Sequence, residues 1–191
     1  MHDPRVQRSR AAVLEATVDL LAAGGSESFS VEAVAKRSGV ARTTIYRHWP
    51  EADDLLVDAV ESVCTVPDDP DTGSVRDDLV ALYEGLVDRL ATSRLGELLP
   101  VMLDLARRDE SMRRVHRRFT AERRQPALTA VTRGIDRGEL PDGTDADGLV
   151  DRVAGPIFYR FLVLQDPYPV DAVAGIVDDG LAATRRERIR S

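Results

Sequence analysis

With 191 residues, of which 43% are hydrophobic, the chain is long enough to bury a proper core, as one unit or as a small domain and a larger one. Its single cysteine, Cys64, excludes an internal disulfide and a metal site built from several cysteines, and it suits a reducing cytoplasm. The net charge is −7, yet residues 1–50 carry seven cations against five acids, so one mildly basic end on an acidic body favours nucleic acid binding at that end only.

The amino-terminal residues 1–9 are charged and lack an apolar core, so they do not form a signal peptide. Apolar stretches elsewhere are too short to span a bilayer. We therefore expect a cytoplasmic protein with no membrane partner. No repeat or low-complexity tract occurs.

A first helix is predicted from near Ser9 to Ala23, because apolar residues recur on one face from Val13 to Leu21. Three arginines precede or begin it, at Arg5, Arg8 and Arg10. Such an arm can reach phosphate or the minor groove in DNA-binding domains, and a disordered polar terminus is an equally open interpretation.

Residues 30–49 read as two short helices joined by a tight turn at Gly39, which is a helix-turn-helix. Val31, Val34 and Ala35 form one apolar stripe on the first helix. Ser30 is placed to cap that helix, and Glu32 favours the dipole at the same end.

The second helix, from Ala41 to Trp49, has only a thin apolar seam, made by Val40, Ile45 and Trp49. Its other side chains can all hydrogen-bond to a duplex. We expect bases to be read by Arg42, Thr43 and Thr44, and phosphate or sugar to be held by Tyr46, Arg47 and His48. Ser30 and the three amino-terminal arginines complete the predicted DNA-binding set. The alternative is an ordinary solvated helix that contacts no DNA.

Several short sequences in fixed order and spacing carry a resemblance. They are Val13-Leu14-Glu15-Ala16-Thr17, Leu20-Leu21, Gly25, Phe29-Ser30, Val34-Ala35, Ser38-Gly39-Val40, Thr44-Ile45-Tyr46-Arg47-His48-Trp49 and Leu55-Leu56. Over roughly residues 8–60 the chain thereby resembles the amino-terminal domain of TetR-type transcriptional repressors.

The resemblance implies an all-α fold, with a three-helix helix-turn-helix domain followed by a helical bundle for ligand binding and dimerisation. It implies a regulator that binds a palindromic operator as a homodimer and is released by a small-molecule effector. The two recognition helices of such a dimer lie roughly 34 to 36 Å apart, one turn of DNA. Effector binding would pivot the helix at 51–65 and change that separation.

Two positions depart from the family pattern. Ala41 stands where a capping Ser or Thr is usual, an exchange that costs about 1 kcal/mol. Near Ala52 the family usually places a lysine that meets a phosphate, whereas here Glu51, Asp53 and Asp54 would repel the DNA backbone. Both departures bear on affinity for DNA.

The predicted domains are 1–50 for DNA binding, a connecting helix at about 51–65, and 66–191 for ligand binding and dimerisation. The breaker-rich loop from Val66 to Ser74 marks the boundary. Apolar periodicity after it predicts helices at 74–93, 95–108, 110–137 with a bend at Pro126, 147–164 and 170–185.

Apolar side chains in this carboxy-terminal part are candidates for two sites. Those that could line a ligand pocket are Tyr83, Leu86, Leu99, Met102, Leu103, Phe119, Phe158 and Tyr159, although core packing explains each of them as well. By resemblance, the last two helices form the dimer interface, through Leu149, Val153, Ile157, Phe161, Val173, Ile176, Val177 and Leu181. Ordinary core packing is the alternative.

Catalytic patterns are lacking. His2, His48 and His116 are scattered, Cys64 has no evident base, and there is no phosphate loop or nucleophile elbow, so we expect no enzyme, cofactor or metal. Two other classes stay open: a helical ligand-binding or partner-binding protein with a non-functional DNA-binding head, and an all-α enzyme with convergent acids.

Overall fold

The computed structural model describes residues 4–63 and 66–187, with side chains up to Thr184. Every regular element in these residues is helical, which confirms the predicted all-α fold. None of the described helices is long and apolar enough to cross a membrane. Cys64 and His2 lie outside the described residues.

The chain divides into two compact units. Unit 1 comprises residues 1–65 and 94–119, and unit 2 comprises residues 66–93 and 120–191. The sequence predicted one break, at 66–74. The structure adds residues 94–119 to the amino-terminal unit, because the start of α6 (Arg94–Arg108) is bound to the first helix of the chain.

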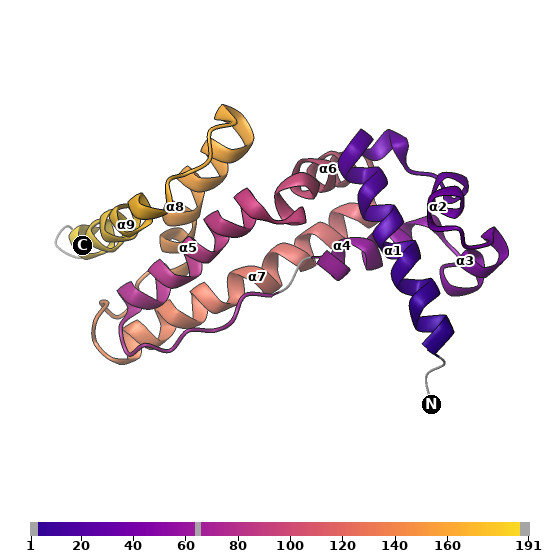
Figure 1. The fold of residues 1–191 in the computed structure, drawn as a ribbon. Coiled ribbons are helices and arrows are strands. Elements are labelled where there is room, and N and C mark those ends of the chain that lie inside the picture. The colour runs from indigo at the N-terminus through magenta and orange to yellow at the C-terminus, as the bar shows by residue number, and fades with distance from the viewer. Residues whose placement is uncertain (1–3, 64–65, 188–191) are drawn as a thin grey trace. The chain divides into compact units, whose positions relative to one another are not determined.

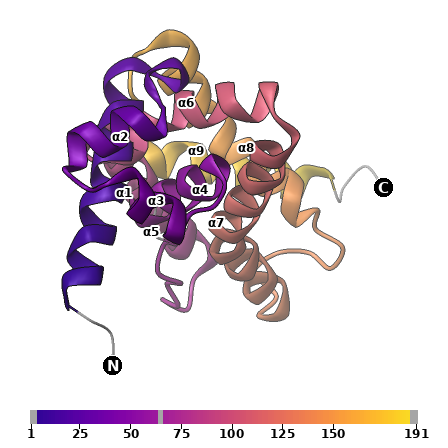
Figure 2. The same ribbon diagram turned by 90° about the vertical axis from the view of Figure 1, so that its right-hand side faces the viewer.

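Unit 1 is built around α1, which contacts α2, α4 and α6 (Figures 1 and 2). Its helices are α1 (Pro4–Gly24), the short 3-10 turn η1 (Ser26–Ser28), α2 (Val31–Ser38), α3 (Arg42–His48), α4 (Ala52–Val63), α6 and the first residues of α7 (Glu110–Asp136). Val13, Leu21, Val34 and Leu55 belong to its core, each no more than 1% exposed. Complete burial of one such side chain stabilises the fold by about 1.5 to 3 kcal/mol.

Asp19 ties two helices to α1. Its carboxylate accepts from Arg37 of α2 at 2.7 Å and from Arg94 of α6 at 2.6 Å. The hydrogen bond from Arg37, with the charge of Arg94 added, holds the pKa of Asp19 below its ordinary value. The Arg37 pair thus links α2, the first helix of the helix-turn-helix, to α1, and the Arg94 pair links α6 to α1.

Unit 2 contains α5 (Val75–Thr92), the rest of α7, α8 (Ala146–Tyr159), a π-helical turn η2 (Arg160–Leu164), a 3-10 turn η3 (Val170–Ala172) and α9 (Val173–Glu187). α9 contacts both α5 and α8. A Cβ on Gly180 of α9 would lie 3.0 Å from Val153 and 3.1 Å from Leu149, both on α8. The two final helices therefore pack closely because position 180 has no side chain.

The loop before α5 is held by a buried carboxylate. Asp78 is fully buried and accepts from the backbone N–H of Thr72 at 2.8 Å and from its hydroxyl at 2.7 Å. Its other oxygen lies 3.5 Å from the guanidinium of Arg133 on α7. Ser74 caps α5 by accepting from the N–H of Asp77.

Candidate nucleic-acid interface

The helix-turn-helix forms at the predicted residues. Ser30 accepts from the N–H of Ala33 at 3.1 Å and so caps α2, and Gly39 adopts the left-handed conformation, with φ of 71°, that ends it. The residue before α3 is Ala41, whose side chain offers no acceptor to the first turn. The sequence departure at this position therefore leaves the start of α3 uncapped.

α3 is attached to unit 1 by few side chains. Ile45 is 1% exposed, and Trp49, which follows the last helical residue, is 4% exposed. The N–H of Trp49 closes the helix by donating to the carbonyl of Ile45 at 2.8 Å. The remaining face is open: the exposed side chains are Arg42, Thr43, Tyr46, Arg47 and His48, and Thr44 is half-buried.

Trp49 is also bound through its ring. Its indole N–H donates to Asp58 of α4 at 2.8 Å, and the guanidinium of Arg10 donates to the same oxygen at 2.6 Å while lying 5.8 Å from the indole centroid. His48 meets Trp49 edge to face, with ring centroids 5.7 Å apart. One carboxylate thus joins the end of α3 to both α1 and α4.

Of the two arginines on the open face of α3, one forms an ion pair with a neighbouring helix. Arg42 forms an ion pair with Glu32 of α2 at 2.7 Å, with more than half of both side chains exposed. Arg47 has no ion pair with any described residue, so its guanidinium is available to an anion. Guanidinium, hydroxyl and phenol groups on one exposed helical face are the groups that contact base edges and phosphates.

The first helix begins earlier than predicted, so the amino-terminal arginines belong to it. α1 begins at Pro4, so Arg5, Arg8 and Arg10 lie on its first turns. Proline suits the first position of a helix and arginine is a good helix former, which explains the early start. Arg5 and Arg8 are exposed, but Arg10 is engaged with Asp58 and belongs to the support of α3.

Asp58, which accepts from both Trp49 and Arg10, is a candidate supporting residue that the sequence analysis did not single out. It lies three residues after Leu55, at the edge of the apolar stripe of α4, and a carboxylate in that position is a signal that it has a partner. At the start of the same helix Ala52 is half-buried, and Asp53 and Asp54 lie in the first turn, where they favour the helix dipole.

The predicted pocket residues are divided between the units. In unit 1, Leu99, Met102 and Phe119 are buried and Leu103 is half-buried. Met102 lines a cavity of about 20 Å³ with Val60 of α4 and His116 of α7, room for about one water molecule.

The predicted pocket residues of unit 2 are either packed in that unit or exposed on its surface. Tyr83 is buried with its hydroxyl donating to the carbonyl of Val150 at 3.3 Å, and this burial raises the pKa of Tyr83. Leu86 and Phe158 are half-buried. Tyr159 is 55% exposed, so it lies on the surface of the unit.

Most of the predicted dimer-interface residues are also core residues of unit 2. Six are buried within that unit: Leu149, Val153, Ile157, Val173, Val177 and Leu181. Phe161 and Ile176 are half-buried. The dimer-interface prediction came from the resemblance, with ordinary core as its alternative; within unit 2, α8 and α9 pack against each other and α9 also packs against α5.

Known proteins with a helix-turn-helix are similar to this chain. Residues 13–59 match the family described as bacterial regulatory proteins, tetR family, and residues 69–179 match the tetracyclin repressor-like C-terminal domain. The chain belongs to the TetR family. It is a DNA-binding transcriptional regulator with an amino-terminal helix-turn-helix, as the resemblance implied.

Relatives cover most of the chain. The uncharacterised HTH-type transcriptional regulator YdeS of Bacillus subtilis is 34% identical over 85% of this chain and 83% of its own. The DNA-binding transcriptional repressor TetR of Mycobacteroides abscessus is 30% identical over 97% of this chain and 98% of its own. The crystal structure of the TetR family regulator SCO0332 is 30% identical, with a TM-score of 0.65 over 91% of this chain and 97% of its own.

Proposed function

We propose that this regulator represses transcription by binding a palindromic operator as a homodimer through α3. The observation that carries the proposal is the open face of α3, where Arg42, Thr43, Tyr46, Arg47 and His48 are exposed while Ile45 and Trp49 fasten the helix from behind. In this arrangement Arg42 and Thr43 read base edges, with Thr44 beside them, and the last three polar residues hold phosphate.

Homodimerisation is proposed on the outward faces of α8 and α9. Gly155 lies inside α8 and Gly175 in the first turn of α9; both are exposed, and a Cβ at either would meet nothing within 4 Å. A glycine inside a helix costs about 1 kcal/mol relative to alanine. Packing within unit 2 does not require either glycine, whereas close approach of a helix from a second copy would.

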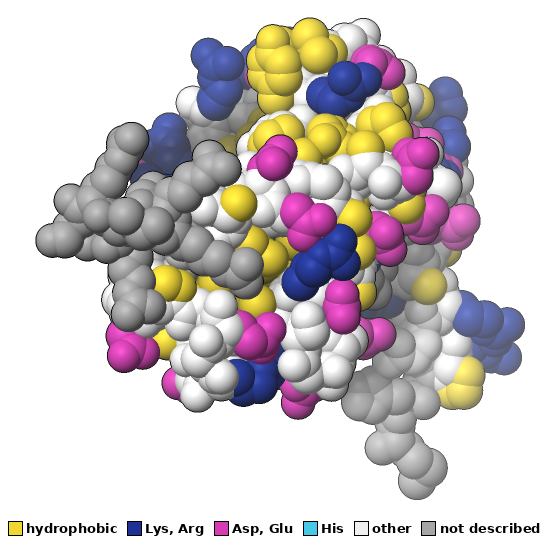
Figure 3. All heavy atoms as spheres, turned by 90° about the vertical axis from the view of Figure 1, so that its left-hand side faces the viewer, with side chains coloured by type: hydrophobic (Ala, Val, Ile, Leu, Met, Phe, Trp, Pro, Cys, Tyr) yellow, Lys and Arg dark blue, Asp and Glu magenta, His cyan; other side chains and the backbone are white. Residues whose placement is uncertain are grey.

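Apolar side chains near the end of α8 support the same surface. Tyr159, Val163, Leu164 and Val170 are between 45% and 64% exposed. Figure 3 shows hydrophobic side chains gathered at the top of the view, where α8 ends. An exposed apolar patch of this kind is typical of a protein interface.

Release from the operator is proposed to follow binding of a small molecule. The candidate apolar residues are Leu99, Met102, Leu103 and Phe119 in unit 1 and Tyr83, Leu86, Phe158 and Tyr159 in unit 2. The effector stabilises a second arrangement in which α4 carries α3 to a different position. α4 is suited to this role, because Asp58 binds it to Trp49 at the end of α3.

The proposal is tested by selecting duplexes from a random pool with the purified protein and then measuring the stoichiometry of the complex. We expect enrichment of a palindrome whose half-sites are about one helical turn apart, bound by two copies of the chain. Enrichment of an asymmetric site bound by one copy would contradict the dimeric mechanism, and a pool without enrichment would contradict operator recognition itself.

A further inference from the structure

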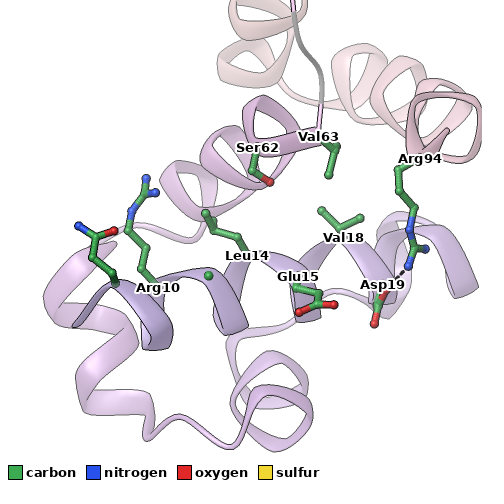
Figure 4. A pocket seen from close by; sticks show the side chains of 10 residues that line it. Arg10, Leu14, Glu15, Val18, Asp19, Ser62, Val63 and Arg94 are labelled. Carbon is green, nitrogen blue, oxygen red and sulfur yellow. Dashed lines mark hydrogen bonds and ion pairs between the residues drawn. The ribbon is translucent and has the colours of Figure 1, made fainter. Parts of the chain in front are cut away.

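An open groove of about 440 Å³ lies within unit 1, away from the exposed face of α3. It is formed by α1, the end of α4 and the first residue of α6 (Figure 4). Leu14 and Val18 point from α1 toward the end of α4, and Val63 points back toward them. The floor of the groove is therefore apolar, and its volume is within the range of about 300 to 1,000 Å³ that small-molecule sites occupy.

Four charged side chains line this groove, and three of them are already neutralised. Arg10 is paired with Asp58 at 2.6 Å. Arg94 is paired with Asp19 at 2.6 Å and with Glu97 at 2.9 Å. Both guanidinium groups therefore have carboxylate partners, and an incoming anion would have to displace one of them.

Glu15 is the exception among the described residues that line the groove. It is exposed on α1, one residue after Leu14, and has neither an ion pair nor a side-chain hydrogen bond with a described residue. The groove thus combines an apolar floor with one uncompensated negative charge. A ligand complementary to it carries a single positive charge on an apolar body.

We propose that this groove binds an amphipathic organic cation, with its apolar part on Leu14, Val18 and Val63 and its charge beside Glu15. The site lies in the DNA-binding unit and differs from the effector site of the proposed function. It goes beyond that function because it gives the helix-turn-helix unit a ligand site of its own.

The groove is joined to the recognition helix by a chain of two hydrogen bonds. Arg10 lines the groove and donates to Asp58, which also accepts from the indole of Trp49. A cation bound beside Arg10 repels its guanidinium and changes the charge environment of that indole. Trp49 is the single tryptophan of the chain, so its fluorescence reports occupancy of the groove.

The experiment is a fluorescence and calorimetric titration of the full chain, without DNA, using three probes with the same ten-carbon tail: decyltrimethylammonium, decyl sulfate and decyl maltoside, each below its micellar concentration. We expect saturable binding of the cation with a change in Trp49 emission, and weaker binding of the other two. Equal binding of all three probes would overturn the proposed charge selectivity.

Two variants locate the site. Glu15→Gln removes the free carboxylate and should weaken binding of the cation about three- to five-fold, the effect of losing one partly solvated ion pair. Glu51→Gln is the matched control, because Glu51 is an exposed carboxylate of the same unit outside the groove. Ala11→Leu adds side-chain volume to the lining of the groove and should weaken the binding of all three probes.

Each outcome has a distinct meaning. Unchanged affinity in both Glu15→Gln and Ala11→Leu would place the probe elsewhere and overturn the groove as its site. Binding seen by calorimetry with silent Trp49 fluorescence would keep the groove and overturn its connection to the recognition helix. Because no DNA is present, failure here leaves operator binding standing, and failure of operator binding leaves the groove standing.

Discussion

The indole N–H of Trp49 donates to the carboxylate of Asp58 at 2.8 Å, across the joint between α3 and α4. The oxygen that accepts this bond also accepts from Arg10 of α1 at 2.6 Å. Three helices that carry or support the recognition face therefore meet at one carboxylate. We therefore expect the orientation of α3 to depend on Asp58, which lies on α4 and outside the exposed face of α3.

Asp58→Asn should weaken this joint. The amide keeps one acceptor oxygen but loses the charge that holds Arg10, and hydrogen bonds to charged groups are the stronger ones. We expect a loss of about 1 to 2 kcal/mol in the free energy of unfolding, measured in urea by Trp49 fluorescence. Glu15→Gln, at an exposed carboxylate of the same unit with no ion pair to a described residue, is the control, and equal stability of the two variants would contradict the role of Asp58.

Glu32→Gln should strengthen DNA binding. Glu32 occupies the guanidinium of Arg42 at 2.7 Å and adds a negative charge beside the expected phosphates. Since the pair is exposed, the gain is limited to about 1 kcal/mol. It is measured as the dissociation constant for a selected duplex at fixed salt, and weaker binding by the variant would show that Glu32 positions Arg42 instead of competing for it.

His116→Leu should change how stability depends on pH. Burial lowers the pKa of His116, and its Nδ1 has no hydrogen-bond partner in the structure. As pH falls through the ordinary histidine pKa of about 6.5, the unfolded chain takes up the proton first, so stability is lost from that value down to the folded pKa. We expect the leucine variant to show a flatter stability profile between about pH 7 and pH 5. Parallel profiles would contradict this effect of burial.

Gly155→Trp should give a monomer. The position is open in the isolated chain, so the large side chain is accommodated by the unit but blocks a second copy. Gly155→Ala adds a single Cβ, so it should weaken the dimer less than tryptophan does while increasing helix stability by up to about 1 kcal/mol. Sedimentation velocity distinguishes the two outcomes, and a dimeric tryptophan variant would place the interface elsewhere.

The local structure of the helix-turn-helix was predictable because it rests on short-range chemistry. The cap at Ser30 and the left-handed Gly39 each follow from a residue type at a fixed place in the motif. The order of the helices also followed from apolar periodicity. Such features need no knowledge of what lies across the fold.

Long-range relationships were not predictable in the same way. The pairing of Arg10 with Asp58 joins residues 48 positions apart, and the sequence offered a free arm as an equally sound interpretation of the first arginines. The burial of Val153 and Val177 depends on which face of α8 meets α9, and apolar periodicity alone does not distinguish a core face from a dimer face.

The most direct test of the account compares the wild-type protein with Arg42→Ala on a selected duplex and on a scrambled one, at two salt concentrations. We expect the variant to lose about 1 to 3 kcal/mol of specific binding, while its weak, salt-sensitive binding to the scrambled duplex changes little. Equal affinity of wild type and variant for the selected duplex would contradict base reading by α3. Binding to neither duplex by the wild type would favour a ligand-binding protein whose helix-turn-helix no longer functions.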